Sequence, residues 1–99
     1  MKGVVAYVPN LMDRSRFGSS VEFINRLSLL TEVEANVLIV DLSSPGVLAH
    51  LPENQYVIGY APHVDETLLD DEASVSGCNE ALARSVFFRR LPEILKTYE

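Results

Sequence analysis

Asp41 is the residue whose position in this sequence most suggests chemistry. It directly follows the apolar run VLIV (37–40) and precedes the segment LSSPG (42–46), which is typical of a turn. A short apolar run bounded by turn residues indicates a buried strand, so Asp41 is expected at the carboxyl end of that strand. There its carboxylate can face a bound ligand, or it can accept backbone N–H bonds from the turn. The spacing alone leaves both uses open.

Five short segments have the apolar and β-branched composition of strands, namely residues 4–8, 21–24, 37–40, 56–60 and 81–83. Near-continuous apolar strands are typical of a parallel sheet that is covered on both faces. Because helical segments alternate with these strands, the sequence predicts an α/β fold with a doubly wound five-stranded parallel sheet, strand order 2-1-3-4-5, and helices on both faces. A chain of 99 residues buries one core, so residues 1–99 are expected to form a single domain.

The first two crossovers are expected to be helical. Asn10 can cap a helix over residues 11–19. Asn25 can cap a second helix, in which apolar residues recur at helical spacing as far as Ala35. In a sheet of the predicted order, ligands bind outside the carboxyl ends of the first and third strands. Asn10 is therefore expected beside Asp41 in that crevice.

The remaining crossovers differ in length. Residues 45–52 leave room for a single helical turn, so the third helix is expected to be truncated. A fourth helix is expected over residues 65–75, because acidic residues open it and Gly77 follows its end. Ser85 can cap the last helix, which Pro92 must either kink or restart.

The segment around Asp41 resembles the phosphoacceptor segment of bacterial response-regulator receiver domains. The strand VLIV, Asp41 itself and Pro45, four residues later, carry this resemblance. The similarity continues through residues 56–61 and 77–84, which correspond to the fourth strand and the entry and tip of the fifth. The resemblance implies that Asp41 stands in the phosphoacceptor position of a signalling or partner-binding module.

The positions that bind a divalent ion in receiver domains are altered here. In that family a pair of acidic residues after the first strand holds the ion, and this chain has Pro9 and Asn10 instead. Magnesium prefers carboxylate and water oxygens, so no metal cofactor is expected. Asp13 could substitute only if it pointed back over the start of its helix, and we expect it to face solvent.

The positions that carry the receiver switch also differ. Tyr60 takes the place of the hydroxyl residue on the fourth strand, and Arg84 takes the place of the lysine on the fifth. Arg84 can form an ion pair with Asp41 or contact a bound anion, although a guanidinium is not equivalent to an ammonium. Ala81 occupies the aromatic switch position, and Ser85 replaces the usual proline. These departures favour a pseudo-receiver that works without phosphorylation of Asp41.

Charge and composition limit the partners. The formal net charge of −6 repels phosphate backbones and anionic lipids, so neither nucleic acid nor a membrane surface is expected as a ligand. The sequence has no apolar run of the length that a membrane helix needs, and its single cysteine, Cys78, cannot form an internal disulfide. A cytoplasmic location is expected.

Receiver domains commonly dock partners through the fourth helix, the fifth strand and the fifth helix. On the corresponding segments this chain carries the acidic residues Asp70 and Asp71 and the basic residues Arg89 and Arg90, so the resemblance implies a protein partner or a homodimer. The alternative is that these charges form a solvated surface.

Three other functions remain to be weighed. Asp41 could be phosphorylated as in an ordinary receiver. A flavodoxin-like module could bind a small ligand in the same crevice, but residues 9–12 are not the Gly-rich and Ser/Thr-rich turn that phosphate binding requires. An enzyme is not expected, because no nucleophile with a neighbouring base is evident in the spacing.

Overall fold

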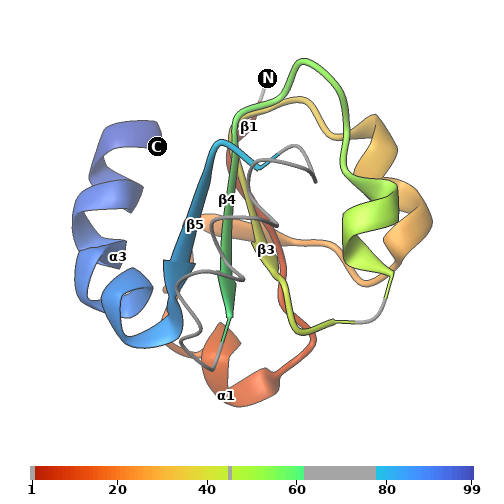
Figure 1. Ribbon diagram of the computed structural model, residues 1–99. Coiled ribbons are helices and arrows are strands. Elements are labelled where there is room, and N and C mark those ends of the chain that lie inside the picture. The colour runs from red at the N-terminus through yellow and green to blue at the C-terminus, as the bar shows by residue number, and fades with distance from the viewer. Residues whose placement is uncertain (1, 45, 62–77) are drawn as a thin grey trace.

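A five-stranded parallel sheet forms the centre of the protein (Figure 1). The computed structural model describes residues 2–44, 46–61 and 78–99. The strands are β1 (Lys2–Tyr7), β2 (Val21–Phe23), β3 (Ala35–Asp41), β4 (Val57–Ala61) and β5 (Glu80–Ala83). Their order is β2-β1-β3-β4-β5, and every neighbouring pair is parallel. The predicted α/β class and strand order are confirmed.

Apolar side chains lie on both faces of the sheet. In β3, Val37 and Ile39 belong to one buried cluster, whereas Leu38 and Val40 belong to another. The helix α3 (Arg84–Tyr98) covers the first face, and the short 3-10 helices η1 (Leu27–Glu32) and η2 (Val47–His50) cover the second, as Figure 1 shows. Helices on both faces explain why the central strands are apolar almost throughout.

The first crossover contains only one turn of α-helix, α1 (Leu11–Arg14). The predicted cap is confirmed, because the Asn10 side chain accepts hydrogen bonds from the backbone N–H groups of Met12 (2.8 Å) and Asp13 (3.2 Å). The predicted extension to residue 19 is wrong. The Ser15 hydroxyl donates to the carbonyl of Met12 (2.6 Å), and the chain then turns to bury Phe17 in the core.

The second crossover forms η1 rather than the expected α-helix. The position before η1 is Arg26, which makes no side-chain cap, so the prediction that Asn25 caps this segment is wrong. The Asn25 side-chain oxygen instead accepts a hydrogen bond from the guanidinium of Arg14 (2.7 Å). Leu30 is buried as the apolar spacing predicted, but Ala35 already belongs to β3.

The third crossover is truncated, as the sequence predicted. It contains the single turn η2, which begins after Gly46 in the left-handed conformation (φ 81°). Val47 in this turn is fully buried against the sheet. The predicted fourth helix over residues 65–75 lies outside the described residues.

The last helix, α3, runs from the carboxyl to the amino edge of the sheet. It continues through the exposed Pro92, and it begins at Arg84, so Ser85 lies within the first turn and is not the cap. At the far end the Asn36 side chain donates to the carbonyl of Tyr98 (2.8 Å), and the Tyr98 ring stacks on Tyr56 with centroids 5.7 Å apart. Among the described residues, no helix has both the length and the apolar character needed to cross a bilayer.

Candidate functional site

Asp41 lies where the sequence placed it, at the last position of β3. It is 7% exposed, and its Oδ1 accepts hydrogen bonds from the backbone N–H (2.9 Å) and the hydroxyl (2.6 Å) of Ser43. Of the two uses that the sequence left open, the structural one is therefore present. The carboxylate organises the turn that follows the strand.

Asp13 is the second carboxylate of this crevice, and the expectation that it faces solvent is wrong. It is only 3% exposed. Its Oδ2 accepts a hydrogen bond from the Tyr60 hydroxyl (3.2 Å), and its two oxygens form a forked ion pair with the guanidinium of Arg84. Both carboxylate oxygens are thus engaged in charge-assisted or polar contacts.

The position of Asp13 follows from the cap of α1. Because the Asn10 side chain accepts hydrogen bonds from the N–H groups of Met12 and Asp13, α1 begins at Leu11, shortly after β1 ends at Tyr7. Asp13 is the third residue of this turn, and side chains in a helix point back toward its N-terminus. Figure 1 shows α1 at the carboxyl ends of the strands, and the contacts of Asp13 with Tyr60 of β4 and Arg84 of α3 place its side chain at this edge of the sheet. Asn10 itself is exposed and serves as the cap.

Arg84 makes its ion pair with Asp13, so the predicted pair with Asp41 is wrong. Its side chain is 35% exposed, and its guanidinium carbon lies 5.1 Å from the centroid of the Phe88 ring. The hydrogen bond to Asp13 raises the pKa of Arg84, against the opposing effect of partial burial. The aromatic face and the carboxylate together fix the orientation of this guanidinium.

Tyr60 is the penultimate residue of β4, and it pairs with Asp41 of β3. Its side chain is fully buried, and its ring stacks on Phe87 with centroids 4.6 Å apart. Burial, followed by the negative charges of Asp41 and Asp13, raises the pKa of the Tyr60 phenol well above its ordinary value. The hydroxyl therefore stays protonated and acts as a hydrogen-bond donor to Asp13.

The crevice thus brings together two carboxylates, one phenol and one guanidinium, from α1, β3, β4 and the start of α3. We refer to Asp13, Tyr60 and Arg84 as the crevice triad. Within residues 2–44, 46–61 and 78–99 there is no cluster of three or more His, Cys, Asp or Glu residues able to hold a metal ion. The positive charge that pairs with Asp13 is the guanidinium of Arg84.

The residues expected to form a partner surface are partly described. Arg89 is exposed on α3, whereas Arg90 forms an ion pair with Glu80 (3.4 Å). Glu80 also accepts a hydrogen bond from the Tyr56 hydroxyl (2.7 Å). The predicted acidic residues Asp70 and Asp71 lie outside the described residues. Arg89 is therefore the more available of the two predicted arginines.

The role of Asp13 is the functional feature that sequence reasoning missed. A signal for it was present, because Asn10 and Asp13 have the spacing of a cap residue and the third helical position. A carboxylate at that position, on a helix that starts at a strand tip, is directed toward the neighbouring tips. The positively charged residue at the tip of β5 would then have identified its partner.

Comparison with known protein families, with curated proteins and with solved structures finds no match to this chain. The fold and site define a doubly wound α/β domain whose crevice contains an ion pair between a buried carboxylate and a partly exposed guanidinium. Its function must be inferred from these features.

Proposed function

We propose that the protein is a receiver-like interaction module whose crevice is held in one state without phosphorylation of Asp41. The ion pair between the buried Asp13 and Arg84 is the observation that carries this proposal. It supports a fixed state because the charge of each partner is already satisfied by the other. The strand order and the position of Asp41 agree with the receiver resemblance.

The first argument concerns the metal ion that receiver phosphorylation requires. In the receiver pattern the ion is held by acidic residues after the first strand, and here those positions carry Pro9 and Asn10. Asp13 supplies a carboxylate nearby, but Arg84 and Tyr60 engage both of its oxygens. A magnesium ion would have to displace the guanidinium before Asp13 could bind it.

The second argument concerns the switch. A receiver hydroxyl must be free to approach the phosphorylated aspartate. Tyr60 is instead fully buried, stacked on Phe87 and hydrogen-bonded to Asp13. Its large ring cannot move without opening the core on the α3 side, because interiors are close-packed. These contacts support a module that does not change state through this residue.

A second candidate function is phosphorylation of Asp41, and the position of Asp13 favours it. Asp13 accepts a hydrogen bond from the Tyr60 hydroxyl, and Asp41 is the β3 partner of Tyr60, so both carboxylates lie near one residue of the crevice. If Arg84 left Asp13, this region would offer the oxygen ligands that magnesium prefers. The two candidates therefore differ in whether the ion pair opens when a phosphoryl donor and magnesium are present.

Intact-mass measurement after incubation with acetyl phosphate and magnesium distinguishes them. We expect no mass increase for the wild type. Arg84→Gln serves as the informative variant, because it removes the guanidinium that would compete with magnesium for Asp13. Asp41→Asn serves as the control, because it lacks the phosphoacceptor carboxylate. Gain of one phosphoryl group by the wild type, with loss of this gain in Asp41→Asn, would overturn the proposal and establish the second candidate.

The interaction role is proposed for α3 and β5, where Arg89 is exposed. A basic residue there suits an acidic patch on a protein partner or on a second copy of this chain. Sedimentation equilibrium of the wild type and Arg89→Glu tests the homodimer. Lys96→Glu serves as the control, because it makes the same change of charge at another exposed residue of α3, in the last turn of the helix. Dissociation by Arg89→Glu alone supports self-association through this face. A monomer at all concentrations leaves a different protein as the partner.

A further inference from the structure

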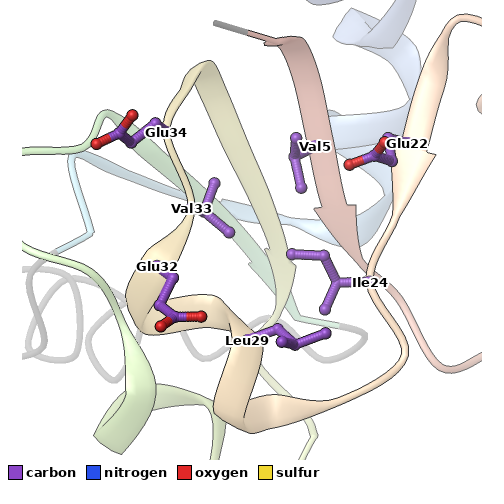
Figure 2. Close-up of a pocket in the computed structure, with 7 residues that line it drawn as sticks. All are labelled: Val5, Glu22, Ile24, Leu29, Glu32, Val33 and Glu34. Carbon is purple, nitrogen blue, oxygen red and sulfur yellow. The ribbon is translucent and has the colours of Figure 1, made fainter.

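We propose that a groove between β2 and η1 binds a basic, partly apolar peptide segment of a partner protein. The groove has a volume of about 440 Å³. Four apolar side chains and three carboxylates line it, and Figure 2 shows all of them: Val5, Ile24, Leu29, Val33, Glu22, Glu32 and Glu34. It lies on the sheet face that η1 and η2 cover, opposite α3. This site is thus separate from the crevice triad and from Arg89.

The apolar floor suits an aliphatic side chain. Val5 and Ile24 are buried members of the core, and Val33 is half-buried beside them. Leu29 is different, because it is 45% exposed at the mouth of the groove. Covering Leu29 and filling the space above Ile24 would remove apolar surface from water, which favours binding.

The carboxylates lie on both sides of this floor. Figure 2 shows Glu22 on the β2 side and Glu32 and Glu34 on the side where η1 leads into β3. A segment with an aliphatic residue beside lysines or arginines would place its apolar side chain on the floor and a positive charge against the rim that Glu32 and Glu34 form. Lysine and arginine also have apolar stems that can lie along the groove wall. The net charge of −6 adds long-range attraction for such a segment.

Fluorescence anisotropy with three probes tests this assignment. The probes are a labelled peptide in which leucine and lysine alternate, the same peptide with glutamate in place of lysine, and labelled spermine. The protein variants are the double variant Glu32→Gln/Glu34→Gln and Leu29→Ser, which removes an exposed side chain and should leave folding intact. Glu53→Gln is the control, since Glu53 is an exposed glutamate outside the groove lining.

We expect the leucine–lysine peptide to bind the wild type and Glu53→Gln equally. Both groove variants should weaken this binding about fivefold or more, since each loses at least about 1 kcal/mol of interaction. The glutamate peptide should not bind.

Three outcomes would overturn the assignment. Equal weakening by Glu53→Gln would mean that net charge alone attracts the peptide, and full binding by Leu29→Ser would exclude the apolar floor. Groove-dependent binding of spermine without binding of the peptide would identify a small cation as the occupant instead.

Discussion

The Tyr60 hydroxyl donates a hydrogen bond to Oδ2 of Asp13 over 3.2 Å, and this contact joins the end of β4 to the first crossover. Arg84 completes the arrangement from the start of α3. Three segments that are distant in the sequence are thereby held together at the carboxyl edge of the sheet. The following predictions concern this arrangement and the elements that support it.

Removing the Asp13 charge should weaken the fold. We expect Asp13→Asn to lower the free energy of unfolding by about 1–2 kcal/mol, because the partly solvated Arg84 would keep its charge but lose its carboxylate partner. Urea denaturation measures the change, with the exposed Glu53→Gln as a control that should stay within about 0.5 kcal/mol of the wild type. In a double-mutant cycle with Arg84→Gln, a coupling energy below about 0.5 kcal/mol would contradict a stabilising ion pair.

Tyr60→Phe should change how stability depends on pH. Burial raises the pKa of Tyr60 above its ordinary value of 10.0, so the folded protein keeps this proton while the unfolded chain loses it. The stability that the protonated phenol supplies is therefore complete below pH 10 and decreases as the pH rises further. At pH 11 the wild type should lose about 1.4 kcal/mol more than Tyr60→Phe does.

Urea denaturation at pH 8 and pH 11 measures this difference. At pH 8, Tyr60→Phe should cost about 1 kcal/mol, because it removes one hydrogen bond and keeps the ring stacked on Phe87. Tyr56→Phe is a necessary comparison, since the hydrogen bond to Glu80 also raises the pKa of Tyr56. Identical alkaline losses in the wild type and Tyr60→Phe would show that Tyr60 does not titrate in this way.

The cap of α1 should matter beyond its own turn. Asn10→Ala leaves the N–H groups of Met12 and Asp13 without their side-chain acceptor and should cost about 1 kcal/mol. Asn10→Ser retains an acceptor and should cost less. Combining Asn10→Ala with Asp13→Asn should give less than the sum of the two losses, because the cap positions Asp13. Strict additivity in urea denaturation would contradict that positioning role.

Gly59 in β4 should resist substitution by alanine. A Cβ at this position would lie 2.8 Å from Leu42 Cγ and Cδ2 and 2.9 Å from its Cδ1. We expect Gly59→Ala to cost about 1–3 kcal/mol through overpacking beside Tyr60. The double variant Gly59→Ala/Leu42→Ala should recover part of this loss. Measured against Leu42→Ala alone, Gly59→Ala should cost less than it costs in the wild type. Failure to recover any of it would point to a backbone cause rather than a clash with Leu42.

Much of the sheet could be predicted from the sequence, because the pattern of apolar residues in a strand shows which of its faces are buried. The run VLIV is apolar at every position since both of its faces are buried, and the buried side chains of β3 confirm this. The helical crossovers were harder to predict. The ends of α1 and η1 depend on contacts such as Ser15 with Met12 and Arg14 with Asn25, and local spacing does not contain them.

The candidate site shows the same division. Asp41 could be placed because it directly follows a strand. The partner of Arg84 could not be predicted in this way. Arg84 pairs with Asp13 rather than Asp41 because the one-turn helix α1 brings Asp13 to the sheet edge, and because Ser43 already donates hydrogen bonds to Asp41. Pairing across 71 positions of sequence is a property of the assembled crevice.

The attachment of α3 at both of its ends has a consequence for cooperativity. Arg84 ties its start to the first crossover, while Tyr98 ties its end to Asn36 and Tyr56 at the opposite edge. Neither terminus of this helix is therefore free to fray independently. We expect its central amides to exchange with deuterium only when the sheet itself opens, so that the helix and the strands form one unfolding unit.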